Sequence, residues 1–318
     1  MLNYIFKRII HAAEVLFVVS LITFAVLLWI PGDVAQLILG SDATPEKLEA
    51  LRISLGLDRA WYLQYWDWLK GLFRLDLGQS YLFGQNVTTL IAQRLPVTLS
   101  IAVFSMLIAS VTAILLGSLA AIKKNTKTDY FVTGLMQLGS SVPSFWIGML
   151  CIVFFGLKLK IFPITGYVPI EKGFIPYLNS IFLPSFVLAI GEIGMLLRTV
   201  RTSMLDSLRQ DYMDMAKVKG LPKVTVYLKY ALRSAMIAPI NVMGIQFAKL
   251  VGGTVVIESV FSLPGLGRLI LVAVEQRDIM LLQGLVIFIT FLVILISLIV
   301  DIAVMFLNPR IRVQMEGE

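Results

Sequence analysis

The residue types that catalysis most often requires are scarce in this chain of 318 residues. It has one cysteine, Cys151, and one histidine, His11, so it can form neither an internal disulfide nor a metal site of imidazole and thiolate ligands. No lysine is preceded by glycine and followed by serine or threonine, which excludes a P-loop for nucleotide phosphates. We therefore predict no enzyme activity, no cofactor and no metal site in this chain.

Ionisable side chains inside apolar stretches are the other possible source of chemistry. Glu192, Lys249 and Asp301 lie within such stretches. A charge near the centre of a bilayer costs at least about 2.5–3.5 kcal/mol, so a residue in this position predicts a functional role. Lys249 could bind an anionic substrate, or it could instead pair with Glu192 or snorkel towards the membrane surface. Asp301 is the only aspartate well inside a stretch, which excludes the paired aspartates of an intramembrane protease.

The residues around Lys249 define two helical faces. Gly244, Ala248 and Gly252 repeat every four positions, a spacing that permits close packing of membrane helices. The other face is polar and contains Lys249. We expect this part of the chain to contribute a translocation path lined by Asn241, Gln246, Lys249, Gly253 and Glu192.

The composition places these residues in a membrane protein. Hydrophobic residues make up 58% of the chain and charged residues 15%, whereas soluble domains carry about 25% charged residues. The net charge is +7. Lys and Arg outnumber Asp and Glu in the segments on the side of the N-terminus, and the two kinds are nearly balanced on the other side. This asymmetry predicts cytoplasmic termini and explains the basic excess without a nucleic-acid partner.

Six apolar stretches are long enough to cross a bilayer as helices, and no small-residue cleavage site follows the first. The sequence therefore predicts an all-α integral membrane fold, with residues 1–318 forming one membrane domain. The predicted spans are residues 9–30, 97–122, 131–157, 181–197, 236–257 and 284–307. Pro143 lies inside the third span and should kink it, because proline has no amide donor.

Residues 31–95 form the predicted external helical segment. Thr44 followed by Pro45 is typical of a helix start, and a second helix from Trp61 to Phe73 is rich in aromatic residues. Aromatic side chains concentrate at membrane–water interfaces, so we expect this second helix to lie along the outer headgroups. A platform that stacks a ligand is the alternative.

A charged loop, residues 198–235, interrupts the apolar pattern. Apolar side chains recur there at helical spacing, and two small residues follow one turn apart, features that a solvated connector does not need. We expect a short amphipathic helix that docks into a groove of another protein. The predicted docking residues are Leu205, Leu208, Asp211, Tyr212, Asp214, Met215, Ala216, Lys219 and Gly220.

At Asp214, Met215, Ala216 and Gly220 the loop resembles the EAA loop of the permease subunits of bacterial ABC importers. Further positions over nearly the whole chain resemble the peptide/opine/nickel branch of these permeases, and the long external segment resembles its first permease subunit. These positions include Pro31-Gly32-Asp33, Leu55-Gly56-Leu57-Asp58, Asp76-Leu77-Gly78 with Ser80, Val142-Pro143-Ser144, Gly252-Gly253 through Glu258, Pro264-Gly265-Leu266-Gly267 and Asn308-Pro309-Arg310.

The resemblance implies a type I importer permease fold with six spanning helices in the bacterial inner membrane. It also implies a heterodimer with a second, homologous permease and an external substrate-binding protein. Two ATPase subunits on the cytoplasmic face would bind ATP and Mg. The loop helix would be the coupling helix that docks into an ATPase groove, and transport would proceed by alternating access.

The substrate is less closely specified than the family. Leu75 stands where peptide permeases usually have glycine before Asp76, and Gly253-Thr254 leading to Ile257-Glu258 is similar to nickel and metal-chelate permeases. These residues favour nickel or metal chelates, with di- or oligopeptides as the alternative. A secondary transporter or channel that works alone is the remote alternative, because the two halves of the chain share no detectable repeat.

Overall fold

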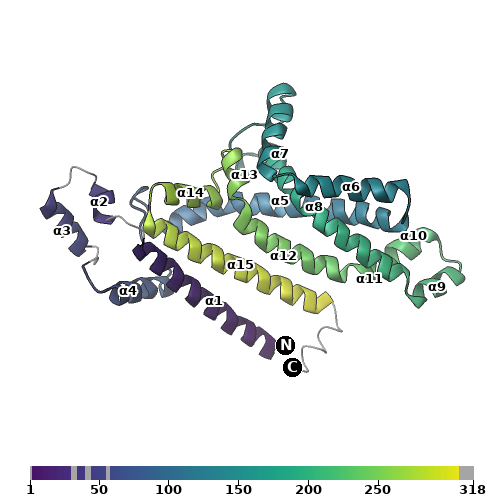
Figure 1. Ribbon diagram of the computed structural model, residues 1–318, viewed down its shortest axis with the longest axis horizontal. Coiled ribbons are helices and arrows are strands. Elements are labelled where there is room, and N and C mark those ends of the chain that lie inside the picture. Colours follow the sequence, from purple (N-terminus) through teal and green to yellow (C-terminus); the bar gives the residue numbers. More distant parts are fainter. Residues whose placement is uncertain (1, 30–33, 40–43, 55–57, 308–318) are drawn as a thin grey trace. The chain divides into compact units, whose positions relative to one another are not determined.

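The computed structural model describes residues 2–29, 34–39, 44–54 and 58–307. Within these ranges the ordered elements are helices, and the one β pairing is the isolated bridge between Gln79 and Asn86 (Figure 1). The chain divides into two compact units. Unit 1 contains Val97–Pro264 and the part from Val293 onwards, and unit 2 contains Leu2–Pro96 and Gly265–Leu292. The prediction of an all-α fold is confirmed for the described residues.

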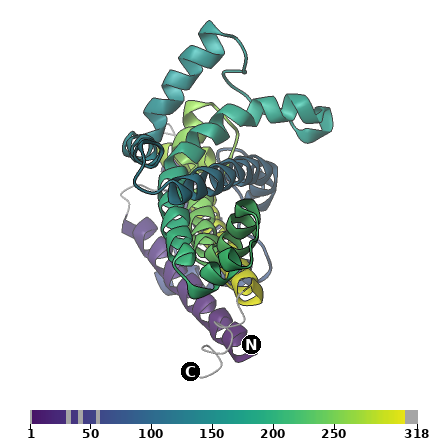
Figure 2. The ribbon, with the colours of Figure 1, turned by 90° about the vertical axis from the view of Figure 1, so that its right-hand side faces the viewer.

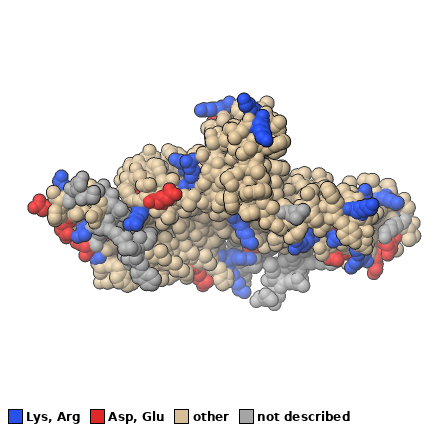
Figure 3. All heavy atoms as spheres, turned by 45° about the horizontal axis from the view of Figure 1, so that its top comes forward, with Lys and Arg blue, Asp and Glu red and all other residues tan. Residues whose placement is uncertain are grey.

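Four helices in the described ranges are long and apolar enough to cross a membrane. They correspond to the predicted spans one, two, four and six. A fifth candidate is a pair, Lys223–Ala235 with Ile237–Gly253, bent by 53°. The four helices are α1 (Leu2–Trp29), α5 (Val87–Ile122), α8 (Phe174–Leu208) and α15 (Ile279–Leu307). Most of the surface visible in Figure 3 carries neither acidic nor basic side chains, as expected for a membrane protein.

The predicted third span, residues 131–157, is not one continuous helix. Helix α6 (Lys127–Ser141) ends before Val142, whose backbone is extended, and Pro143 precedes α7 (Ser144–Cys151). The residue before a proline is disfavoured in the helical region, so Pro143 breaks the helix where only a kink was expected. A π-helix, η1 (Ile152–Lys158), continues α7, and the two project from the other helices of unit 1 (Figure 2).

The boundaries of the other spans also differ from the predictions. Helix α8 extends well beyond residues 181–197 at both ends, and α5 begins ten positions before Val97. Helix α12 (Ile237–Gly253) ends before the predicted limit at residue 257, because the pair Gly252-Gly253 has low helix propensity. A short helix α13 (Val255–Val260) follows it, and the segment before α15 contains α14 (Leu266–Glu275).

The apolar positions of the charged loop do not lie on one helix, contrary to the prediction from the sequence. Leu205 and Leu208 belong to the end of α8, whereas Tyr212 and Met215 lie on α9 (Asp211–Val218). Two carboxylates in the first turn of α9, Asp211 and Asp214, favour a new helix start, because they complement the positive end of its dipole. The remaining elements are α10 (Lys223–Thr225), the π-helix η3 (Val226–Leu232) and α11 (Arg233–Ala235), gathered at the end of α8 (Figure 1).

Gly220 follows α9 and terminates it. Its φ angle is +69°, in the left-handed region that glycine adopts at little cost, and the Leu221 amide donates to the Ala216 carbonyl at 3.4 Å. Pro222 then precedes α10. The chain therefore turns sharply between α9 and the segment that leads into α12.

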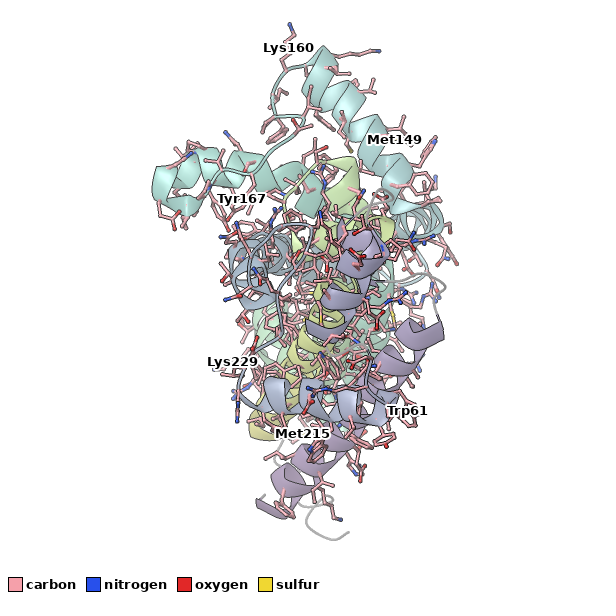
Figure 4. The ribbon with its side chains drawn as sticks, turned by 90° about the vertical axis from the view of Figure 1, so that its left-hand side faces the viewer. Trp61, Met149, Lys160, Tyr167, Met215 and Lys229 are labelled. Carbon is pink, nitrogen blue, oxygen red and sulfur yellow. The ribbon has the colours of Figure 1, made fainter. Side chains whose placement is uncertain are left out.

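Two predicted helices of the external segment are confirmed in unit 2. Helix α3 spans Pro45–Ser54 and α4 spans Trp61–Phe73, while α2 (Val34–Leu39) was not predicted. Tyr65 of α4 is buried against Phe24 of α1, with ring centroids 5.2 Å apart, and its hydroxyl is 2.8 Å from the Ser20 hydroxyl. Trp61 remains exposed (Figure 4). The motifs at residues 31–33, 55–57 and 308–310 lie outside the described residues.

Candidate functional site

Helix α9 has an inner side that packs into its own chain. Met213 and Ala216 are buried in a cluster with apolar residues of α5, α8 and η3, including Val200 and Met204. Leu205 and Leu208 are partly buried against the same cluster. Three of the predicted docking residues therefore pack α9 against its own chain and do not face a partner. They are Leu205, Leu208 and Ala216.

The outer side of α9 carries the other predicted docking residues. Met215 is 62% exposed, and Val218, which the sequence analysis missed, is 85% exposed. Val218 lies three positions after Met215, so helical spacing alone could have identified it. We call this surface the docking face; its exposed residues are Asp211, Tyr212, Asp214, Met215, Val218 and Lys219.

Hydrogen bonds fasten this part of the loop to α8. The Ser207 hydroxyl donates to the Ala231 carbonyl of η3 at 3.0 Å, and its oxygen is 2.9 Å from the Tyr212 hydroxyl. Tyr212 therefore anchors the start of α9, although its ring remains partly exposed. Because one serine contacts both α9 and η3, a displacement of α9 would be transmitted to the end of α8.

An ion pair joins α8 to α6 close to the start of the loop. Nε and Nη2 of Arg201 each lie 2.7 Å from a carboxylate oxygen of Asp129. The Asp129 side chain is 3% exposed, and it also accepts a hydrogen bond from the Asn125 amide at 3.0 Å. The hydrogen bond from Arg201 is the main cause that lowers the pKa of Asp129 below its ordinary value. We call this bidentate pair the α6–α8 junction.

The predicted path residues occupy different environments. Lys249 and Gly253 of α12 are exposed, while Asn241 of α12 and Glu192 of α8 are half-buried. The Lys249 ammonium exerts an electrostatic attraction on the Glu192 carboxylate, but the two form no ion pair within 4.0 Å. The alternative of a direct structural pair is therefore not realised in this conformation.

Gln246 lies on the packed side of α12. It is 4% exposed, and its Nε2 donates to the Glu192 backbone carbonyl at the long distance of 3.5 Å. Its Oε1 is buried and has no partner within the described part of the chain. Gln246 therefore faces α8, and it does not share the exposed face that Lys249 occupies.

The glycines of α12 divide between packing and open surface. A Cβ at Gly244 would lie 2.0 Å from Val300 of α15, so the predicted close packing of helices is confirmed at this position. A Cβ at Gly252 or Gly253 would meet nothing within 4 Å. Around Gly252 and Gly253, next to Lys249, the helix surface is therefore open with respect to the residues that the structure describes.

The motif that ends in Glu258 has a structural role that sequence reasoning did not identify. Glu258 is fully buried and accepts hydrogen bonds from Thr98 of α5 at 2.7 Å and Thr254 at 2.8 Å. Buried polar side chains are costly unless they are hydrogen-bonded, so these contacts fix α13 against α5. Thr98 is 160 positions away, and no local pattern could have indicated it as the partner.

A comparable carboxylate organises the part of unit 2 around Ser80 and the start of α15. Asp278 is fully buried, accepts hydrogen bonds from Ser80 at 2.5 Å and the Leu82 amide at 3.2 Å, and caps α15 through the Leu281 amide at 3.1 Å. The motif around Ser80 is thus held in place by Asp278. Burial, together with the charge of Asp278, raises the pKa of neighbouring Tyr81 above its ordinary value.

Two family models match the chain. Residues 113–313 match the binding-protein-dependent transport system inner membrane component, and residues 1–102 match the N-terminal part of the corresponding membrane component. The α6–α8 junction, the docking face and the exposed face of α12 lie within the first of these regions.

Whole-length relatives agree with these matches. A protein of Brucella abortus (strain 2308), named as a peptide transport system permease, is 41% identical over 308 residues, covering 97% of this chain and 98% of its own. The glutathione transport system permease protein of Escherichia coli (strain K12) is 36% identical over 312 residues, covering 98% and 99%.

The fold is similar to solved structures of the MetNI methionine ABC transporter in inward-facing conformations. One such chain aligns with a TM-score of 0.58 and 17% sequence identity, covering 69% of this chain and 96% of that chain. At this identity the similarity establishes the fold, which is that of a type I importer permease.

Proposed function

The chain belongs to the family of binding-protein-dependent transport system inner membrane components, and from this premise we propose that it provides half of an ATP-driven path for peptides. It is a multi-pass permease of the inner membrane. A second, homologous permease would complete the path. Two further kinds of chain would complete the importer: ATPases, which would bind ATP and Mg, and an external substrate-binding protein.

The observation that carries this proposal is the two-sided character of α9. Its inner side is anchored in the chain through Met213 and Ala216, and its outer side exposes Met215 and Val218 among charged residues. Exposed apolar side chains on a short amphipathic helix are typical of a helix that docks into a partner's groove. An ATPase that pushed on this face would displace α8 and η3, because both are bound to the same helix.

The exposed face of α12 is our proposal for the path. Lys249 lies there beside the open positions Gly252 and Gly253, with Glu192 half-buried on α8. Asn241 would extend this lining, whereas Gln246 would hold α12 against α8. A lysine and a glutamate that are not paired directly are suited to the opposite charges of a peptide's two ends.

Peptides are the substrate class that we propose. The sequence alone favoured nickel or metal chelates, but the two permeases described above are named for peptide and glutathione transport. The described residues also contain no group of three or more His, Cys, Asp or Glu side chains that could hold a metal ion. Nickel or a metal chelate remains the second candidate, because Leu75 and the residues at 253–258 are similar to those of nickel and metal-chelate permeases.

Reconstitution in proteoliposomes tests the proposal. We expect the chain, its partner permease and the ATPases to accumulate a short peptide in the presence of ATP and the binding protein, and not to accumulate Ni²⁺. Val218→Asp should reduce both ATPase co-purification and uptake more than tenfold. Ile161→Asp, the same change at an exposed site outside α9, should leave both intact. Uptake by the chain without ATPases would instead indicate a secondary transporter.

Lys249 can be tested in the same system. We expect Lys249→Gln to slow the uptake of peptides with a free carboxyl terminus and to affect C-terminally amidated peptides much less. Lys160→Gln, at the exposed tip of the projecting segment, is the matched control (Figure 4). Equal effects on both kinds of peptide would show that Lys249 does not bind the carboxylate.

A further inference from the structure

A basic pocket lies in the segment that joins α9 to α12. It has a volume of about 330 Å³ and is lined by Lys229, Tyr230, Arg233 and Ser234. This volume is at the lower end of the range of small-molecule sites. The pocket is open to the surface, and the two cations and two hydroxyl groups among its lining residues are a donor set suited to a phosphate group, which accepts several hydrogen bonds.

The four side chains that line the pocket are available to a ligand. None of them forms a hydrogen bond or an ion pair within the described part of the chain. Lys229 and Arg233, like Tyr230 and Ser234, are four positions apart and therefore lie on the same side of the helix. Lys229 and Tyr230 belong to the π-helix η3, a rare backbone form that is frequent at functional sites.

The surroundings of the pocket indicate where its ligand comes from. Leu228 is 58% exposed and Ile237 is 39% exposed, on either side of the pocket residues in the chain. Ile237 also begins α12, so the pocket lies where the charged loop passes into a membrane helix. Cations beside exposed apolar side chains at such a boundary are typical of contacts with anionic lipids of the cytoplasmic leaflet.

We propose that Lys229, Tyr230, Arg233 and Ser234 bind the phosphate of an anionic membrane lipid, with its acyl chains lying along the exposed apolar residues nearby. The bound lipid would hold η3 at the membrane surface, next to the 53° bend into α12. The loop would then be in contact with the ATPase through the docking face and with a membrane lipid through this pocket, so both could affect its position. The inference does not depend on which substrate the importer carries.

A photo-crosslinking experiment tests the site in the assembled importer. The complex is placed in nanodiscs of phosphatidylcholine that contain a photoactivatable phosphatidylglycerol, and the crosslinked peptides are mapped. We expect crosslinks on residues 223–237. The double variant Lys229→Gln/Arg233→Gln should reduce this labelling about twenty-fold, because each cation near an anionic surface accounts for about a fivefold change in affinity.

The control variant is Lys158→Gln/Lys160→Gln. It removes two exposed cations, Lys158 at the end of η1 and Lys160 at the tip of the projecting segment, where Figure 4 labels it. It should leave the labelling of residues 223–237 unchanged. A milder pair, Tyr230→Phe and Ser234→Ala, removes only hydroxyl groups. This pair should reduce labelling severalfold even where the charge variant assembles poorly.

Three outcomes would overturn the proposal. If inorganic phosphate in detergent competes with the lipid at millimolar concentration and alone protects this segment, the site binds free phosphate. If residues 223–237 are labelled only after the ATPases are removed, the pocket belongs to the ATPase interface. Equal labelling of the wild type and both pocket variants would likewise exclude a lipid site here.

Discussion

The α6–α8 junction and the segment from α9 to α11 follow one another along the same unit, but they are built in opposite ways. At the junction a carboxylate that is 3% exposed is held by two hydrogen bonds from Arg201. In the segment the charged side chains whose burial the structure describes, among them Asp211, Lys229 and Arg233, are exposed, and the buried side chains, such as Met213, are apolar.

This difference suits the two regions to different tasks: the junction can transmit a movement between helices, and the segment from α9 to α11 can bind other molecules. Buried, bidentate pairing gives one geometry and resists displacement, so α6 and α8 should move together. Exposed charges on short helices leave both a docking face and a basic pocket accessible to other molecules. Substitutions at the junction should therefore affect stability most, and substitutions of the exposed apolar residues of the docking face, Met215 and Val218, should affect assembly with almost no effect on stability.

The largest effect is expected from Asp129→Ala. This change leaves Arg201, which is 24% exposed, without its carboxylate, and we expect a loss of about 2–3 kcal/mol in the free energy of unfolding. Asp67→Ala is the matched control, because Asp67 pairs with Arg59 at 3.2 Å in the open, and exposed pairs contribute about 0–1 kcal/mol. Unfolding of the purified complex in detergent measures both. Equal losses would remove the distinction between the two kinds of pair.

The same pair predicts a dependence on pH. The pKa of Asp129 is lowered in the folded protein, so its contribution is fully present above the unfolded value of about 3.9 and is lost as the pH falls through the folded value. The difference in stability between the wild type and Asp129→Ala should therefore be constant from pH 8 to about pH 5 and should shrink below about pH 4. A difference that varied around neutral pH would show that another group is responsible.

Ala216→Leu should have the next largest effect. Ala216 is 4% exposed in the cluster with Val200 and Met204, so a larger side chain would overpack it, at a cost of about 1–3 kcal/mol. The control is Met215→Leu on the opposite side of α9, which should be nearly neutral. If Ala216→Leu left stability unchanged but prevented ATPase binding, Ala216 would belong to the docking face after all.

The region around α9 also shows what the sequence could not predict. Positions 205, 208, 212 and 215 have the spacing of one helix, but the turn at Arg209 and Gln210 divides them, and no proline or glycine marks it. A small residue such as Ala216 suits both a partner's groove and the chain's own core. By contrast, the limits predicted for the helix from Trp61 to Phe73 agree with α4, and Gly220 marks the end of α9, because both signals are local.

Gly220→Val is expected to have a smaller effect on stability. At φ +69° a β-branched residue is strained by about 1–2 kcal/mol, although a Cβ there would meet nothing within 4 Å. We expect uptake to fall with little loss of membrane insertion, because the turn that aims α9 would be distorted. Gly134→Val is the control, as Gly134 lies in α6 with open space around it and an ordinary helical backbone. Normal uptake by Gly220→Val would argue against a coupling role for this turn.

Of these substitutions, Met215→Ser should change the free energy of unfolding least, while it should clearly weaken the binding of the ATPase. Because Met215 is 62% exposed, its truncation should alter the free energy of unfolding by no more than about 0.5 kcal/mol. If the side chain fills an ATPase groove, the same change removes apolar contact area only in the complex, and ATPase affinity should fall about tenfold. Titration of labelled ATPase onto the permease pair measures this directly. A loss of stability without a loss of affinity would reverse the assignment of the two sides of α9.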